Sequence, residues 1–426
     1  MKLNVQVDVH HLTRVEGHGN IRVRVVDGIV REAAWDVVET PRYFEVMLKG
    51  KHYSSAGLIT ARICGICSIG HCLASVRASE DAFGVEIPPL ARKLRLLAKH
   101  GETIQSHVLH LFFLAAPDFV SLPSALPLLQ AKPEIVGLAA RLKGLGNALC
   151  DVVAGRTTHP LCIQVGGLTR RPDNAALLEL RRRLVAALDD LHATVELFKT
   201  FQIPDFVRET EFVSLQAQNE YPWIGGKLLS TDGVVSNERD YASMTNEWVN
   251  DRNTTKWCKL SRDSMAVGAL ARFNNNHRFL LPEAAAVAET LGLASVCHNP
   301  FMNNVAQLVE CVHVALESVH LIDQIVAEPA SAPINVPVAP RAGDGVGAVE
   351  VPRGILYHHY TYGEDGRVQK ADCVIPTTQN NKNIHDDLGA LARQFAPLEG
   401  MTDDKLELLC SMLVRAYDPC ISCSVH

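Results

Sequence analysis

The chain has 426 residues, 47% of them hydrophobic and 21% charged, with a formal net charge of −6 at pH 7. This balance is typical of a globular protein with enough apolar material for a buried core. Nucleic acid is not expected as a partner, because no basic stripe could neutralise its phosphates. No apolar run approaches the roughly 18–20 residues of a membrane span and no secretory signal opens the chain, so we expect no direct membrane span.

The twelve cysteines favour a reducing compartment, in which they stay free thiols instead of forming disulfides. We therefore expect a cytoplasmic protein. Export together with a partner that carries a signal is the alternative.

The first 40 residues predict β structure, from the alternation in Leu3–Val9 and in Ile21–Val25. From about residue 68 the apolar period becomes helical. Helices are predicted over four ranges with prolines between them: His71–Phe83, Ala91–Ala115, Glu134–Ala154 and Asp173–Lys199. Residues 203–273 show no steady period and predict irregular structure with short strands.

Helical periodicity returns at Pro282–Leu291 and Pro300–Ala327. A connection, Pro329–Asp344, leads to a predicted hairpin of Gly354–Tyr360 and Val368–Ile375, and Asp403–Arg415 predicts a last helix. We expect an α+β fold, mainly helical, in a single interlocked domain over residues 1–426. Its expected parts are an N-terminal β region (1–60), a core bundle of long helices (68–200 and 300–327), the hairpin region (345–378) and a C-terminal helix and tail (403–426).

Two Cys-x-x-Cys pairs, Cys64 with Cys67 and Cys420 with Cys423, stand at opposite ends of the chain. Four thiolates brought together by the fold would make a site for a soft transition metal. Structural zinc and a pair of redox dithiols are the simpler interpretations. Structural zinc normally closes a short loop, so the wide separation favours a buried catalytic metal.

Four segments resemble signatures of the large, catalytic subunit of NiFe hydrogenases. They run in order from residue 13 to residue 426: Thr13–His18, Arg62–His71, Glu350–Gly354 and Asp418–His426. The resemblance implies reversible heterolytic cleavage of dihydrogen to protons and electrons. It also implies a NiFe(CN)2(CO) centre, with nickel held by Cys64, Cys67, Cys420 and Cys423.

By the family's pattern, Cys67 and Cys423 would bridge nickel to iron, and Cys420 would accept the proton. A metal-bound thiolate can act as a base. Glu16 would take the proton from that sulfur. Without the resemblance, a salt bridge between Glu16 and Arg14 would be the ordinary expectation.

Arg353 resembles the arginine over the open face of the metals, where a permanently charged guanidinium can polarise dihydrogen or bind cyanide. Asp418 would orient Arg353, and Thr377 matches a hydroxyl that hydrogen-bonds cyanide. His71 is expected to orient a bridging sulfur.

Glu45 and His426 match the family's ligands for magnesium or another hard divalent ion near the C-terminus, although imidazole is an unusual magnesium ligand. A chain that ends at His426 also resembles the product of a maturation protease, which acts after nickel-insertion proteins have delivered the metal.

Three positions depart from the family's pattern or stand open. Cys72 follows His71 where small or polar residues are usual, and either faces the site or is a buried inert thiol. Ser106 stands before His107 where some members have an aspartate. His107 and His110 are expected to be core histidines.

The other cysteines show no ligand spacing and are expected in the core: Cys150, Cys162, Cys258, Cys297, Cys311, Cys373 and Cys410. No iron–sulfur cluster is therefore expected in this chain, and a partner must remove the electrons. The resemblance implies an obligate iron–sulfur small subunit. It also favours the cytoplasmic bidirectional branch, whose further subunits couple to NAD(P) through flavin, to deazaflavin or to heterodisulfide-reductase modules.

Three other functions compete with the enzyme. A hydrogen-sensing subunit with little turnover belongs to the same family. The related quinone-site subunit of respiratory NADH dehydrogenase lacks the four cysteines. A structural zinc protein would lack an iron–cyanide–carbonyl centre, which infrared spectroscopy detects.

Overall fold

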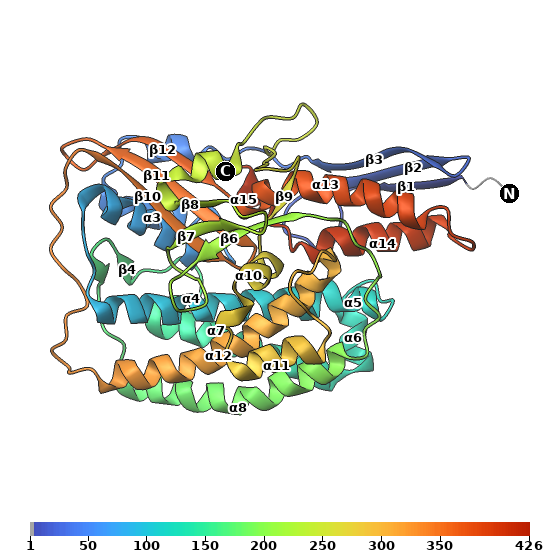
Figure 1. Ribbon diagram of the computed structural model, residues 1–426. Coiled ribbons are helices and arrows are strands. Elements are labelled where there is room, and N and C mark those ends of the chain that lie inside the picture. Colours follow the sequence, from blue (N-terminus) through green and yellow to red (C-terminus); the bar gives the residue numbers. More distant parts are fainter. Residues whose placement is uncertain (1–3) are drawn as a thin grey trace.

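The computed structural model describes residues 4–426, apart from the side chains of Leu128, Leu129 and Ala131; Leu3, where the first predicted strand begins, lies outside these residues. Long helices and β-sheets occupy separate layers (Figure 1). The fold is the mixed, mainly helical one that the sequence predicts.

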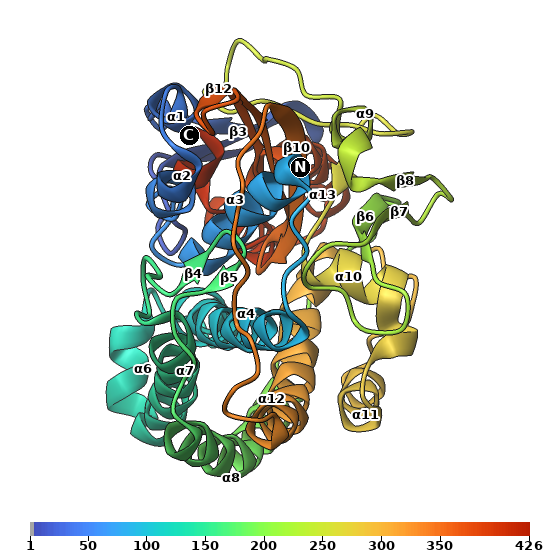
Figure 2. The same ribbon diagram turned by 90° about the vertical axis from the view of Figure 1, so that its left-hand side faces the viewer.

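The helical layer is a bundle in which α4 packs against α7 and α12, and α8 packs against α7 and α12 (Figure 2). Proline opens α4, α7 and α11, where a missing N–H costs nothing. The helices of this layer are α4 (Pro89–Leu109), α5 (Ala116–Phe119), α6 (Ala125–Ala131), α7 (Pro133–Ala154), α8 (Asn174–Phe198), α11 (Pro282–Thr290) and α12 (Asn303–Ala327).

One helix with its preceding turn, Pro300–Ala327, is long and apolar enough to cross a membrane. Its most apolar window is 78% buried inside the protein. Its apolar faces therefore serve the bundle core.

The predicted helix Ala91–Ala115 is in fact two segments. The α-helix α4 ends at Leu109, and a π-helical segment, His110–Ala115, continues it. Such segments interrupt the regular hydrogen-bond ladder and often lie at functional sites. Here it carries His110, whose ring contacts both α12 and α14.

Two three-stranded antiparallel sheets dominate the other layer. The N-terminal sheet comprises β1 (Val5–Val9), β2 (Gly19–Val26) and β3 (Ile29–Val37). The second comprises β10 (Gly343–Val351), β11 (Gly354–Tyr362) and β12 (Val368–Val374). The predicted hairpin is thus β11 and β12, and the sequence prediction missed β10.

Glycines explain both the missed strand and its packing. A Cβ at Gly345 or Gly347 would lie 2.1 or 2.2 Å from a backbone oxygen of α3 (Ser68–Phe83). Glycine therefore permits the close approach of β10 to α3 while weakening the strand signal in the sequence.

The region predicted to be irregular forms a four-stranded sheet in the order β8-β7-β6-β9. Its strands are β6 (Glu211–Gln216), β7 (Lys227–Ser230), β8 (Val235–Asn237) and β9 (Met265–Ala266). The remaining elements are α1 (Phe44–Leu48), α2 (Tyr53–Thr60), β4 (Ile163–Gln164), β5 (Gly167–Leu168), α9 (Tyr241–Thr245), α10 (Ala269–Asn276), α13 (Pro376–Phe395), α14 (Asp403–Ala416) and α15 (Ile421–Ser424).

The two ends of the chain meet between the layers. The N-terminal sheet packs on α13 and α14, and α15 packs on α13. The C-terminus consequently lies inside the outline of the molecule (Figure 1). This arrangement places both cysteine pairs in one interior region.

Candidate metal centre

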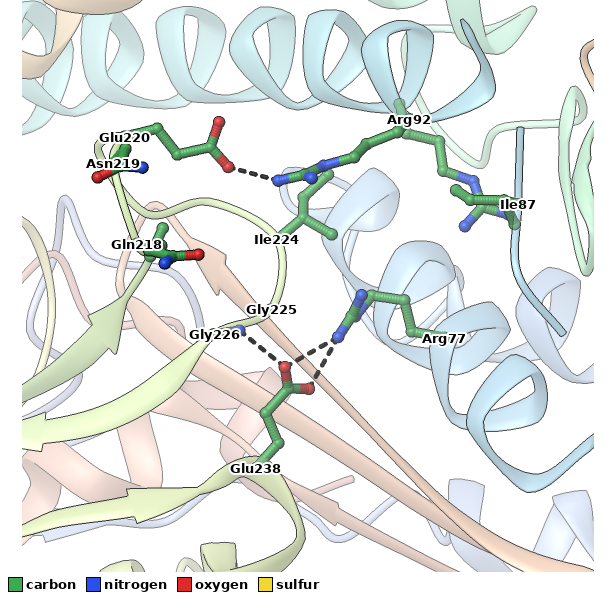
Figure 3. Close-up of a pocket in the computed structure, with 12 residues that line it drawn as sticks. Arg77, Ile87, Arg92, Gln218, Asn219, Glu220, Ile224, Gly225, Gly226 and Glu238 are labelled. Carbon is green, nitrogen blue, oxygen red and sulfur yellow. Dashed lines mark hydrogen bonds and ion pairs between the residues drawn. The ribbon is translucent and has the colours of Figure 1, made fainter. Parts of the chain in front are cut away.

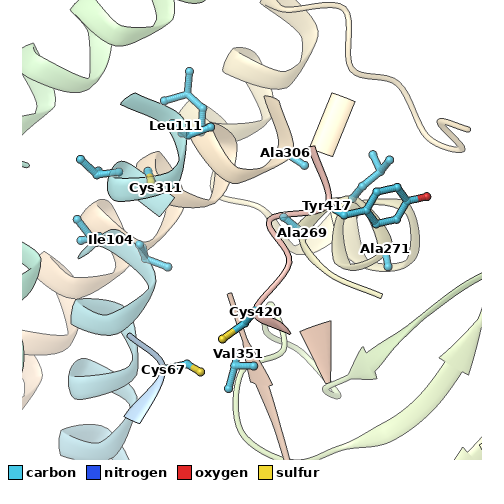
Figure 4. Packing of buried hydrophobic residues seen from close by; sticks show 14 of the residues in the cluster. Cys67, Ile104, Leu111, Ala269, Ala271, Ala306, Cys311, Val351, Tyr417 and Cys420 are labelled. Atoms are coloured by element: carbon cyan, nitrogen blue, oxygen red, sulfur yellow. The ribbon is translucent and has the colours of Figure 1, made fainter. Parts of the chain in front are cut away.

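All four motif cysteines are buried and gather in one cluster. Cys64 lies in the loop before α3, Cys67 caps that helix, and Cys420 caps α15, which contains Cys423. The Sγ atoms of Cys64 and Cys420 are 3.6 Å apart, and those of Cys64, Cys67 and Cys423 lie within 4.8 Å of one another. Figure 4 shows the sulfurs of Cys67 and Cys420 directed toward a common space beside Val351.

A short parallel bridge between Glu16 and Cys420 joins the two ends of the chain. The amide of Ile421 donates to the Glu16 carbonyl at 2.8 Å. Gly17 has φ +86°, and a Cβ there would lie 2.7 Å from Cβ of Ile421. The glycine after Glu16 is therefore required both by its backbone conformation and by the close approach.

The side chain of Arg42 ties the first cysteine motif to the second. Its guanidinium donates to the carbonyl of Ile63 at 2.7 Å and to that of Ser422, and its backbone amide donates to Val425. Arg42 was not identified from the sequence, because its segment carries no pattern of metal-ligand types around it.

The carboxylate of Glu16 faces the second motif. Its Oε2 is 3.1 Å from Sγ of Cys420 and accepts from the amide of Ser422 at 3.0 Å, and its Oε1 accepts from the Ser422 hydroxyl. Arg14 pairs instead with Asp118, so the alternative ion pair between Glu16 and Arg14 does not form. Ser422 was not predicted to be a functional residue, although it lies inside the second Cys-x-x-Cys.

The thiols titrate as a group. Contacts from Cys420, Cys423 and Cys67 lower the pKa of Cys64 well below its ordinary value. Burial, in contrast, raises the pKa of Cys420 and of Cys423 well above it. The cluster thus favours a single thiolate by itself, and further ionisation requires a cation among the sulfurs.

Arg353 is buried beside this cluster. It donates through Nε to the Asp418 carbonyl at 2.5 Å and through Nη2 to Oδ1 at 2.8 Å. Burial opposes its charge, but Asp418 and the sulfurs of Cys420, Cys67 and Cys64 outweigh that and raise its pKa well above the usual value. Its Nη1 is buried and has no hydrogen-bond partner among residues 4–426.

A buried amide and imidazole support Asp418 from behind. Gln307 donates to Asp418 Oδ2 at 3.3 Å, and its Oε1 is 2.6 Å from Nδ1 of His110. His107 contacts Glu310 at 2.8 Å. Both histidines are therefore buried in the core.

Thr377 and His71 are placed around the motifs by short contacts. The amide of Cys420 donates to the Thr377 hydroxyl at 2.9 Å. His71 lies one turn after Cys67, its Nδ1 is 3.2 Å from Nε2 of His358, and burial lowers its pKa to about 3. Cys72 Sγ lies 3.9 Å from the Ile163 carbonyl, and burial raises its pKa to about 12, as for an inert thiol.

Glu45 and His426 meet at a second cluster. His426 Nε2 is 3.4 Å from Glu45 Oε1, and Cys373 joins them with a sulfur within 4.8 Å of both. The sequence predicted Cys373 to be a core cysteine; it is buried, but it also adjoins these two side chains.

A surface hollow between α3, α4 and the loop before β7 contains none of the predicted site residues (Figure 3). Carboxylates already neutralise two of its arginines: Arg77 contacts Glu238 at 2.9 Å and Arg92 contacts Glu220 at 2.5 Å. Among the described residues, its walls offer no group of metal ligands.

The model of the family described as nickel-dependent hydrogenase matches residues 42–141 and 218–426. The alpha chain of sulfhydrogenase 2 from Pyrococcus furiosus is 33% identical over 421 residues, covering 99% of this chain and 98% of that protein. The corresponding protein of the F420-non-reducing hydrogenase of Methanothermobacter thermautotrophicus is 30% identical, covering 99% and 95%. The crystal structure of an NAD+-reducing [NiFe]-hydrogenase in the H2-reduced state superposes with a TM-score of 0.90 at 28% identity, covering 100% of both chains.

The chain therefore belongs to the nickel-dependent hydrogenase family. Within that class it is a large, catalytic subunit of a NiFe hydrogenase, an oxidoreductase that acts on dihydrogen. Large subunits of this class pair with a small subunit.

Proposed function

We propose that Cys64, Cys67, Cys420 and Cys423 hold a nickel–iron centre with cyanide and carbonyl ligands, and that dihydrogen is split reversibly there. Two observations support the fit. The four buried sulfurs need a cation before more of them ionise, and the free Nη1 of Arg353 offers a donor to a ligand of that cation. The centre would supply the soft metals at which dihydrogen is polarised and divided.

The single observation that carries the proton path is the 3.1 Å contact between Cys420 Sγ and Glu16 Oε2. Splitting dihydrogen heterolytically yields two protons and two electrons. Cys420 would accept a proton on sulfur, and Glu16 would receive it and pass it outward. Glu16 is half-buried, which gives it one side toward the sulfur and another toward the surface.

The other side chains would hold the site in shape. Asp418 fixes the guanidinium of Arg353 through two hydrogen bonds, which leaves Nη1 directed at the reacting face. Thr377 anchors the backbone of Cys420, and its hydroxyl hydrogen remains available to a cyanide. His71 would position the α3 end of the cluster from behind.

The resemblance also implies magnesium at Glu45 and His426. The donors present fit it poorly, because magnesium prefers oxygen ligands and these side chains include an imidazole and an adjacent thiol. No step of the proposed reaction depends on that ion. A maturation protease and nickel-insertion proteins remain expected partners from the resemblance.

The electrons would leave through an iron–sulfur small subunit. The names of the relatives indicate NAD and non-F420 acceptors for those proteins, and we propose further electron-transfer subunits of the flavin, deazaflavin or heterodisulfide-reductase type here. A cytoplasmic location fits that branch.

Infrared spectroscopy of the purified complex, with nickel and iron analysis, tests the centre. We expect one nickel per large subunit, together with bands from cyanide and carbon monoxide. Zinc in place of nickel, without those bands, would contradict the proposal. Dihydrogen turnover with an artificial acceptor then separates the enzyme from a sensor of little turnover.

A further inference from the structure

A second set of metal-ligand types lies apart from the four sulfurs. It consists of Glu45 on α1, Cys373 on β12 and the imidazole of His426, with all three ligand atoms within 4.8 Å of one another. The Cys373 amide also donates to Glu45 Oε1 at 2.8 Å, which holds the carboxylate beside the thiol. Strand, helix and tail thus converge on one point.

The hydrogen bonding of His426 directs a lone pair at this point. Its Nδ1 is 3.0 Å from the Cys423 carbonyl, which can only accept, so Nδ1 carries the hydrogen. The neutral ring then presents an unprotonated Nε2 to Glu45 Oε1 at 3.4 Å. Two ligands bound tetrahedrally to one ion, with bonds of about 2.0–2.1 Å, have a separation close to this distance.

The surrounding charge also calls for a cation. Glu45, Glu247 and Asp372 contribute three carboxylates, against which Lys256 supplies one ammonium, 2.8 Å from Glu247. Burial raises the pKa of the Cys373 thiol well above its ordinary value, and Glu45 and Asp372 raise it further. A thiolate at this position therefore needs a bound cation to compensate it.

We propose that Glu45, Cys373 and His426 bind a thiophilic divalent ion, zinc or iron(II), in place of the magnesium that the family resemblance implies. Sulfur, imidazole nitrogen and one carboxylate oxygen form a donor set for such ions, whereas magnesium prefers six oxygens. Binding releases the Cys373 thiol proton to solvent, and water completes the coordination. Because His426 Nδ1 holds the Cys423 carbonyl, this ion would also steady the second cysteine motif.

The test is an anomalous-scattering measurement on crystals of the two-subunit holoenzyme, purified without added metal or metal-affinity resin. Data on both sides of the zinc and iron K edges should show a peak between the three ligands, with sulfur at about 2.3 Å if the ion is zinc. Density without an anomalous signal, as magnesium or water would give, overturns the proposal. An empty position, with His426 and Glu45 as a simple ion pair, overturns it as well.

Two variants separate this site from the catalytic centre. Cys373→Ser should lower the zinc or iron occupancy at this position at least tenfold, while nickel per large subunit stays unchanged. Cys410→Ser, which alters another buried cysteine, serves as the matched control and should leave the occupancy unchanged. Cys373→Ala repeats the test without a hydroxyl, and full occupancy in either Cys373 variant overturns the proposal. Loss of nickel in the wild-type protein would instead count against the four-cysteine centre.

Discussion

Two charged side chains adjoin the four sulfurs, and they are held in opposite ways. Glu16 is half-buried and receives its hydrogen bonds from Ser422 and the Cys420 thiol, with no ion pair among residues 4–426. Arg353 is almost fully buried and is locked to Asp418 by two bonds. The carboxylate can therefore gain and lose a proton with little rearrangement, whereas the guanidinium provides a constant charge.

This difference divides the proposed work between a mobile proton and a fixed charge. A proton carrier needs an exit and neighbours that tolerate both its states. An electrostatic group needs the reverse, because its field is useful only when its position does not change.

Replacing Glu16 by Gln tests the first half of the comparison most directly. The amide keeps the shape but cannot carry the proton, so we expect hydrogen–deuterium exchange to fall about 10²–10⁴-fold, the range for loss of an acid–base group. Exchange would be measured by mass spectrometry of the evolved gas, with infrared bands of the centre as a control for assembly. Glu32→Gln, on the exposed part of β3, is the matched surface change. Wild-type exchange in Glu16→Gln would remove the relay role.

Arg353→Lys keeps the positive charge and removes the planar fork. We expect dihydrogen oxidation to fall about tenfold or more, because one ammonium cannot reproduce the two bonds to Asp418 while also presenting a donor to the site. Initial rates with an artificial acceptor, normalised to nickel content, give the measurement. Arg182→Lys, on the surface of α8, is the control. Equal rates in Arg353→Lys would mean that charge alone suffices there.

Ser422→Ala should give the smallest effect. It removes the hydroxyl donor to Glu16 Oε1 but keeps the amide donor to Oε2, a change of about 1 kcal/mol, and so a few-fold loss of exchange is expected. Ser424→Ala, whose hydroxyl contacts a backbone carbonyl instead, is the control. A loss as large as that of Glu16→Gln would show that the hydroxyl itself carries the proton.

Residue types and spacing predicted the site further than they predicted the fold around it. The two cysteine pairs and Glu16 were identified because their motifs combine ligand types at fixed intervals. Cys373 carries no such interval, since its partners Glu45 and His426 come from distant segments that only the tertiary structure brings together. Ser422 and Arg42 act mainly through hydrogen bonds that no motif encodes.

The helix α13 shows why some elements escaped prediction. Its first turns contain threonine and asparagine, such as Thr378 and Asn380, which are weak helix formers. Burial against the N-terminal sheet and the C-terminal tail stabilises it instead, and its polar side chains find backbone partners: Asn380, for example, accepts from the amide of Val267. Such tertiary stabilisation leaves no periodic signal.

The bridge between Glu16 and Cys420 also has a use as a reporter of assembly. The amide of Ile421 donates to the Glu16 carbonyl, so its hydrogen is shielded from water only when the first and last motifs are joined. Solvent exchange at that single amide would therefore time the closing of the protein around its metals. A precursor with an open tail would exchange there as fast as an unfolded peptide, long before any gas assay could detect a difference.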